Sequence, residues 1–510
     1  MNEVVQGLQL LLNVETFVWI AIGSILGIVL GALPGLTATM GVALMLPVSF
    51  YLPTATGMAM LLAVYCGAVS GASIPAILLG IPGNPNALAT VEDGYRMAKN
   101  GQGGLALGSA ALASLIGGLL SLVILCIFAP ILGAATLAFG PAEKFGLAVL
   151  GLAVIASISA GGMAKGIAMA ALGICLSLIG SDPYTGSPRV PFPELLGATP
   201  LSNGIELIPA LIGLFGVSQA LLDLDRLKEK PPQVPRLELK KLFPSFSKLK
   251  AMWRIILEST GIGTLIGAIP GTGASVAVFI AHERARKITA SNPKLDKVGT
   301  GSVEGVFAPE IANNAVTSGA LIPVLTLGIP GDAVTAVLMG ALMIKGVVPG
   351  NELFTHNLPL VYAIFFGMGF SLIAMFVFQL VGVKLFPQVL RVPLTFLIPF
   401  VLMLSFVGTF SIDGQAVIKA TYNMGVALVM GLIGYVLKKG NYPISPLVLG
   451  LILGKMLEDN YRLAVKLGQG NHFIFFQSPI VLGMLALLLV IFAWPAMSRF
   501  VAQRRGHKTS

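Results

Sequence analysis

The chain has 510 residues, of which 55% are hydrophobic and only 11% are charged, and its mean hydropathy is +0.89. Soluble domains carry about 25% charged residues, so these charges are too few to cover a large soluble protein. The formal net charge of +10 comes from short basic loops beside apolar runs, which argues against nucleic-acid binding. Many windows of roughly 18 to 25 residues are apolar and long enough to cross a bilayer. The composition predicts an all-α polytopic membrane protein.

The first apolar run is predicted to be interrupted. It lacks a preceding basic region, so we expect it to be retained rather than cleaved. It contains "GALPGLTATM", Gly31 to Met40, and both proline and glycine oppose a continuous helix. The flanks, Met1–Phe17 and Ser49–Gly57, carry no base, so the positive-inside rule places both outside. We therefore expect a re-entrant hairpin with its tip near 34–35, entering from the external side.

The next apolar run ends in "SGASIPAILLGIPGN", Ser70 to Asn84, which predicts a broken helix near 82–83. The same pattern returns as "SGALIPVLTLGIPGD", Ser318 to Asp332, with ten identities in fifteen positions and a second break near 330–331. Each copy follows a Pro-Gly segment. Two matches in the same order indicate a duplicated unit.

The second hairpin is predicted from charge. Of the 32 Lys and Arg residues, 14 lie between Arg226 and Lys297, on both sides of the apolar segment Ile255–Ala281. Both flanks should be cytoplasmic. A single crossing would separate them, so we expect a hairpin with its tip near 270–271, entering from the inside.

We therefore expect about eleven crossings plus two re-entrant hairpins, arranged as two inverted repeats with discontinuous helices. The N-terminus should lie outside and the C-terminus inside. The predicted parts are a first repeat at 1–222, a cytoplasmic linker at 223–253, a second repeat with C-terminal scaffold helices at 254–498, and a cytoplasmic tail at 499–510. Inverted repeats with discontinuous helices are typical of secondary transporters. A glycine packing face is an alternative explanation for the motif around Gly31.

A broken helix leaves backbone N–H and C=O groups without partners, which lipid cannot supply. N–H ends suit carboxylates, whereas carbonyls and hydroxyls suit Na⁺. We expect an anion site built mostly of such dipoles, without a buried fixed cation. The predicted substrate-binding residues are Pro34, Gly35, Thr37, Thr39, Gly83, Asn84, Asn86, Pro270, Gly271, Thr272, Ser275, Asn313, Asn314 and Gly331.

Two acids near the breaks, Glu310 and Asp332, are candidates for the coupling ion, because an acid at membrane depth is a functional candidate. The alternative places both at the water boundary, with Asp332 as an N-cap. We predict no catalytic residues, no resident metal and no cofactor other than Na⁺ or H⁺ as a coupling ion. No phosphate-binding loop or zinc-protease motif is present, the three cysteines have no metal spacing, and the four histidines receive no role.

Several long motifs together resemble the large membrane subunit of the tripartite tricarboxylate transporters. They are "GALPGLTATMGVALMLP", "GIPGNPNALATVEDGYRMAKNGQGGLALGSA", "DPYTGSPR", "GAIPGTGASVAVFIAHERAR", "GSVEGVFAPEIANNAVTSGALIPVLTLGIPGDAVTAVLMGAL" and "SPLVLGLILG". The likeness runs from about Val18 to Gly454. The stretch from Val190 to Leu222 is looser than expected, and nothing after Tyr461 is carried over.

The resemblance implies the permease subunit of a secondary active transporter in the bacterial inner membrane. It implies a periplasmic solute-binding protein and a small membrane subunit as partners, and small carboxylates such as citrate as substrates. It also implies coupling to Na⁺ or H⁺. The alternatives are a passive organic-anion channel, a membrane-embedded enzyme and a structural subunit without its own pathway.

Overall fold

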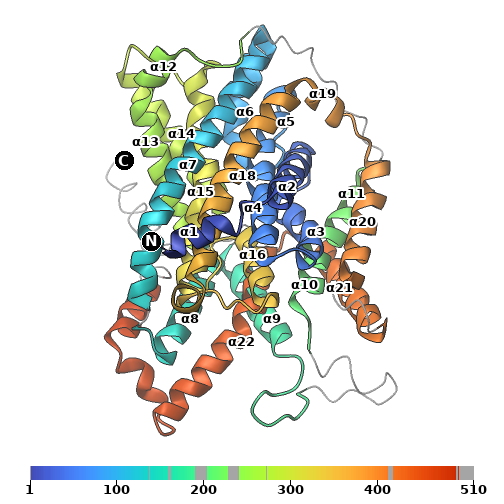
Figure 1. The fold of residues 1–510 in the computed structure, drawn as a ribbon, viewed down its shortest axis with the longest axis vertical. Coiled ribbons are helices and arrows are strands. Elements are labelled where there is room, and N and C mark those ends of the chain that lie inside the picture. Colours follow the sequence, from blue (N-terminus) through green and yellow to red (C-terminus); the bar gives the residue numbers. More distant parts are fainter. Residues whose placement is uncertain are drawn as a thin grey trace, which may run out of the picture. The chain divides into compact units, whose positions relative to one another are not determined.

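The computed structural model describes residues 2–136, 138–158, 162–189, 204–227, 241–270, 273–411, 417–489 and 492 (Figure 1). Within these residues the secondary structure is helical, and the only β-type pairing is an isolated bridge between Ser181 and Pro188. The all-α prediction is confirmed. The tail at 499–510 and the middle of the linker, 228–240, lie outside the described residues.

Packing divides the chain into two compact units. One comprises Met1–Ala134 with Glu206–Val436, and the other Ala135–Ile205 with Leu437–Ser510. Each unit therefore draws on both halves of the sequence, whereas the predicted repeats follow the chain.

The first unit begins with a short helix, and the next two helices flank the first Pro-Gly segment. The bounds of its helices before residue 227 are α1 Asn2–Gln9, α2 Val14–Ala32, α3 Ala38–Phe50, α4 Thr54–Gly71, α5 Ser73–Leu79, η1 Pro85–Ala87, α6 Leu88–Met97, η2 Ala98–Gln102, α7 Gly103–Thr136, α10 Leu207–Leu211, η5 Ile212–Val217 and α11 Ser218–Asp225.

The remaining helices of this unit are α12 Phe246–Ala251, α13 Trp253–Ala268, α14 Gly273–Ser291, α15 Val303–Leu327, α16 Ala333–Ile344, α17 Asn351–His356, α18 Leu358–Val381, η6 Gly382–Lys384, α19 Phe386–Val389, α20 Leu394–Ser411 and α21 Val417–Lys439. Side-chain caps begin several of them. Asn13 accepts a hydrogen bond from the Thr16 N–H, and Ser302 from the Gly305 N–H.

Two helices form the centre of this unit. All but the first residue of α4 and the last of α15 are buried, as expected for helices that are apolar on every side. Asn313 Nδ2 donates to Val69 O at 3.4 Å, and Tyr65 OH donates to Asp332 Oδ2 at 2.8 Å. Thr317, one turn beyond Asn313 on α15, hydrogen-bonds to Cys66, which precedes Val69 on α4. The two helices therefore run antiparallel.

Small residues allow neighbouring helices to approach closely. A Cβ placed on Gly267 of α13 would lie 2.7 Å from Val316 O, and one on Gly263 would lie 2.5 Å from Ala312 O. In α2, a Cβ on Gly27 or Gly31 would likewise strike the backbone of α4. Such small-residue interfaces let backbones meet without a hydrophobic driving force between helices.

Among the described residues, six helical segments are long and apolar enough to cross a membrane: Val14–Ala32, Thr54–Leu79, Pro85–Thr136, Leu207–Asp225, Leu358–Lys384 and Ile418–Lys439. Shorter apolar helices, such as Ala38–Phe50 and Ala333–Ile344, accompany them. The chain is therefore a multi-pass membrane protein. Because α2 has 19 residues and could cross alone by length, the first re-entrant hairpin and the count of eleven crossings stay predictions.

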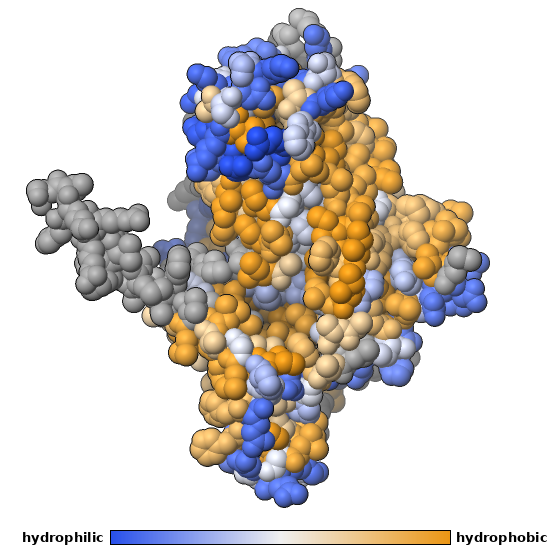
Figure 2. Space-filling view, turned by 90° about the vertical axis from the view of Figure 1, so that its left-hand side faces the viewer, coloured by the Kyte–Doolittle hydropathy of each residue, from blue (hydrophilic) through white to orange (hydrophobic). Residues whose placement is uncertain are grey.

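The face shown in Figure 2 carries hydrophobic side chains along the helices and hydrophilic ones at the end where α12 lies. Leu257 and Leu265 on α13 are 55% and 69% exposed, and Phe279 on α14 is 44% exposed. Exposed apolar side chains in such a continuous band suit contact with lipid.

The second unit contains α8 Pro141–Ile158, α9 Met163–Ser177, α22 Ile444–Leu467 and η7 His472–Phe476. An ionic cluster holds the loop after α9 to α22. Arg462 donates to both oxygens of Asp182, at 3.0 and 2.7 Å, and Arg189 bridges Asp182 and Glu458. The Arg462 hydrogen bonds, helped by the backbone N–H of Tyr184, hold the pKa of Asp182 well below its usual range. The "DPYTGSPR" motif thus has a structural anchor.

Gly267→Val tests the close packing of α13 against α15. The added atoms would overlap the Val316 carbonyl, so we expect a loss of stability of at least about 1–3 kcal/mol and a lower unfolding temperature in detergent. Gly261→Val is the matched control, because nothing lies within 4 Å of a Cβ at that position on the same helix. Equal unfolding temperatures for both variants would contradict the packing.

Candidate functional site

The first Pro-Gly segment forms a turn between α2 and α3. Leu33 ends α2, Pro34 offers no N–H, and Gly35 has φ +95°, which only glycine adopts easily. Thr37 then begins α3 by accepting a hydrogen bond from Met40 N–H at 3.3 Å. Thr37 is therefore occupied as a helix cap, and Thr39 is 8% exposed in the first turn of α3.

The second Pro-Gly segment lies between α13 and α14. Helix α13 ends at Ala268, and Pro270 follows the C-cap residue Ile269. Gly271 and Thr272 lie outside the described residues. Ser275, in the first turn of α14, donates to Asn86 Oδ1 at 2.9 Å.

The two "GIPG" motifs interrupt helices in the same manner. Gly80 after α5 and Gly328 after α15 have φ +70° and +67°, and each ends its helix in the left-handed conformation. Four residues later Asn84 accepts from Asn86 N–H, and Asp332 accepts from Thr335 N–H. The breaks therefore extend over 80–84 and 328–332.

Each break packs against the hairpin of its own half. A Cβ on Gly83 would lie 2.5 Å from Gly31 O and 2.9 Å from Ala72 Cα. A Cβ on Gly331 would lie 2.9 Å from both Gly267 O and Ala320 Cα. In the first half, Gly35 N–H also donates to Gly83 O at 3.4 Å. Only glycine fits at either position, because neighbouring backbone atoms occupy the space.

The halves also contact each other crosswise. Asn86, just after the first break, meets Ser275 of α14, and Asp332 at the end of the second break meets Tyr65 of α4. Gly83 N–H donates to Ala72 O, seven residues beyond Tyr65. Since a helix rises 1.5 Å per residue, the contact at Tyr65 and the contact at Ala72 define two levels that lie roughly 10 Å apart along α4. The structure groups the predicted residues at two levels rather than around one point.

Glu310, Asn313 and Asn314 are fully buried on one face of α15. Thr90 Oγ1 of α6 donates to Glu310 Oε1 at 2.6 Å, and Asn314 Nδ2 donates to Ser114 Oγ of α7 at 2.7 Å. Glu310 Oε2 and the two amide oxygens lack hydrogen-bond partners among the described residues. A buried carboxylate oxygen without a partner is energetically unfavourable, so this position could take up a cation or a proton.

Asp332 has a different environment. Its Oδ1 accepts from the Thr335 N–H and Oγ1, both at 2.8 Å, and its Oδ2 accepts from Tyr65 OH. Thr335 Oγ1 lies 2.9 Å from the Asp332 N–H, which completes a capping box. The geometry explains Asp332 as a helix cap; its predicted role in ion coupling stays a prediction.

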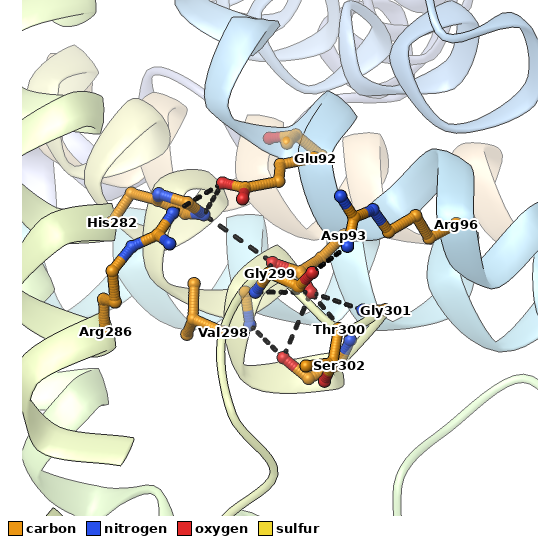
Figure 3. Close-up of polar contacts among 12 residues, drawn as sticks. Glu92, Asp93, Arg96, His282, Arg286, Val298, Gly299, Thr300, Gly301 and Ser302 are labelled. Carbon is orange, nitrogen blue, oxygen red and sulfur yellow. Dashed lines mark hydrogen bonds and ion pairs between the residues drawn. The ribbon is translucent and has the colours of Figure 1, made fainter. Parts of the chain in front are cut away.

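One polar cluster was missed by the sequence analysis, which gave His282 no role. Asp93 on α6 accepts hydrogen bonds from the backbone N–H groups of Gly299, Gly301 and Ser302, at 2.8 to 3.0 Å (Figure 3). His282 Nε2 lies 3.7 Å from both Asp93 Oδ2 and Glu92 Oε2. Some two hundred residues separate these partners, so no local pattern could reveal them.

Glu92, Asp93 and His282 are close enough together to hold a metal ion. However, backbone N–H groups already occupy Asp93, and Arg286 Nη2 binds Glu92 Oε2 at 2.7 Å. A cation there would have to compete with a guanidinium for the same carboxylate. The cluster is better suited to fastening the loop between α14 and α15 to α6.

The fold and the interruptions define a multi-pass helical membrane protein with backbone breaks inside buried helices, an arrangement typical of transporters. Residues 17–449 match the family described as the tripartite tricarboxylate transporter TctA family. The chain belongs to this family and is a membrane transporter component of a tripartite system.

Two relatives from Agrobacterium vitis are similar to this chain. One, named as an uncharacterized 52.8 kDa protein in the TAR-I ttuC' 3' region, is 32% identical over 481 residues, which cover 94% of this chain and 93% of that protein. The other, named as an uncharacterized protein in the TAR-II ttuC' 3' region, is 32% identical over 228 residues, 45% of this chain and 91% of that protein. No solved structure matches.

Asp332→Ala and Asp332→Asn separate capping from charge. Alanine removes the cap and the Tyr65 partner, so we expect a loss of about 1–2 kcal/mol in stability and a lower unfolding temperature in detergent. Asparagine caps a helix as well as aspartate does, so Asp332→Asn should stay close to wild type. Equal destabilisation by both variants would show that the charge, rather than the cap, matters.

Proposed function

We propose that this protein is the permease subunit of a binding-protein-dependent secondary active transporter that imports small carboxylates, either citrate-like tricarboxylates or related organic anions. A Na⁺ or H⁺ gradient drives import across the bacterial inner membrane. A periplasmic solute-binding protein delivers the anion, and a small membrane subunit completes the complex. The N-terminus is periplasmic and the C-terminus cytoplasmic, as the distribution of lysine and arginine favours.

The packing of each hairpin against its own break carries this proposal. Gly83 on Gly31 and Gly331 on Gly267 are equivalent contacts between equivalent motifs. The antiparallel run of α4 and α15 agrees with an inverted duplication. Backbone groups freed at such breaks can bind solutes where lipid could not satisfy them.

Alternating access follows from the same arrangement. The hairpins and breaks form one moving body, which carries the substrate past the remaining helices in an elevator-like motion. Movement as a body requires tight internal packing, and the glycine contacts between α2 and α4 and between α13 and α15 supply it.

Glu310 is the residue proposed to couple transport to the cation gradient. It is fully buried, and its Oε2 lacks a hydrogen-bond partner among the described residues. The Thr90 hydroxyl of α6, which donates to its Oε1, carries no charge to balance the carboxylate. A cation or proton bound there would neutralise the carboxylate before the body moves, which lowers the energy of carrying it through the membrane. Asp332, with both oxygens occupied, is the weaker candidate.

The decisive measurement is uptake of labelled citrate into vesicles under an imposed Na⁺ or proton gradient, with and without the solute-binding protein. We expect saturable accumulation against the citrate gradient that depends on one of the two ion gradients and on the binding protein. Unsaturable flux that no ion gradient can concentrate would instead indicate a passive organic-anion channel.

Glu310→Gln tests the coupling role. The amide keeps the size of the side chain but has no negative charge to neutralise and no proton to release, so gradient-driven accumulation should fall at least tenfold while the protein still folds. Exchange of internal for external citrate, which needs no net ion movement, should persist. Glu352→Gln, at an exposed position in the first turn of α17, is the matched control and should accumulate citrate normally. Full accumulation by Glu310→Gln would refute the assignment.

A further inference from the structure

An arginine that no motif singled out lies at the first hairpin turn. Helix α11 ends at Asp225, and Arg226 caps it. A Cβ placed on Gly35 would lie 3.2 Å from Arg226 Nη1, 3.4 Å from Asp223 Oδ1 and 3.5 Å from Gln219 Nε2. Three polar side chains from α11 and its cap therefore converge on one glycine, almost two hundred residues away in the sequence.

Gly35 permits this approach for two reasons. Its φ of +95° is strained for residues with a side chain, and the absence of a Cβ leaves room for the guanidinium. Proline and glycine at the turn therefore do more than end a helix, because the turn also brings the backbone close to the guanidinium of Arg226.

The first turn is also more accessible than the second break. Pro34, Gly35 and Thr37 are partly exposed, and Ile81 in the adjacent break is 48% exposed. By contrast, Ile329, Pro330 and Gly331 are buried. The backbone at the first turn is therefore partly exposed at the surface of the described residues.

We propose that Arg226 binds a carboxylate of the transported anion at the first hairpin turn. A guanidinium pairs with a carboxylate through two parallel hydrogen bonds. Gln219 Nε2 adds a neutral donor beside Gly35. This inference rests on the proposed function and names the substrate-recognition residue that it lacked.

Asp223 has a defined part in this site. It is 2% exposed, and its Oδ1 accepts from Gln219 Nε2 at 3.1 Å. Asp223 Oδ1 and Arg226 Nη1 both lie near the position that a Cβ on Gly35 would take, so Asp223 supplies negative charge near the guanidinium. The substrate carboxylate then competes with Asp223 for Arg226, which limits affinity and allows release. Because Arg226 lies within the segment assigned to the cytoplasmic linker, 223–253, the site serves release into the cell.

The test uses the full chain with its binding protein in vesicles, and citrate as the probe. Arg226→Gln should raise the KM for citrate about tenfold to a hundredfold, the loss expected for one hydrogen-bonded charge, with a smaller change in maximal rate. Arg226→Lys should lie between, because lysine keeps the charge but not the paired geometry. Asp223→Asn should lower the KM or leave it unchanged. Arg391→Gln, at an exposed arginine after α19, is the control.

The alternative is that Arg226 only holds the hairpin in place through Asp223. In that case Arg226→Gln and Asp223→Asn would both lower the maximal rate and leave the KM unchanged, which would overturn the proposal. Protection of the purified protein against heat by citrate gives a second readout, and its persistence in Arg226→Gln would also count against recognition. If wild-type protein transports no carboxylate, the proposed function itself fails, which is distinguishable from failure of Arg226 alone.

Discussion

The structure depends on one constraint: backbone groups freed inside a membrane helix must find partners within the protein. At the first break the constraint is met by contact with the neighbouring hairpin, since Gly35 N–H reaches Gly83 O and Gly83 N–H reaches Ala72 O. These contacts need backbones at van der Waals distance, and glycine is the residue that allows it. The glycines therefore serve packing, and under the proposed function they would also allow a solute to approach the backbone, so the two explanations weighed for the motif around Gly31 do not exclude each other.

Much of the fold was predictable because it rests on local chemistry. Proline, left-handed glycine and capping side chains act within four residues, so the turn at Gly35 and the breaks at 80–84 and 328–332 follow from the motifs. The repeated motif could also be recognised from the sequence, because each copy is one short continuous stretch of the chain. Crossing number was less predictable, because 19 residues of α2 satisfy both a full span and one arm of a hairpin.

The parts that escaped prediction depend on long-range partners. His282 between Glu92 and Asp93, and Arg226 beside Gly35, join segments about two hundred residues apart. The scarcity of charge near the motifs predicted a site made of dipoles alone, and the proposed role of Arg226 would add to it a guanidinium from the linker. Asp332 is the opposite case: its place next to a break in the sequence made it a candidate for ion coupling, and in the structure its carboxylate caps the following helix.

The two halves differ where their chemistry has to differ. Asn84 and Asp332 are equivalent in the repeat, and each caps the element that follows its break. A carboxylate accepts the same cap hydrogen bond as an amide but adds a negative charge. Asn84 is 8% exposed, so a carboxylate at that position would bury its charge, and the neutral asparagine avoids this cost. At the second break Asp332 is partly exposed, and the hydroxyl groups of Tyr65 and Thr335 donate to its carboxylate and stabilise the charge. The backbone geometry is therefore common to both breaks, whereas the charge at the cap follows the burial and the hydrogen-bond donors of each position.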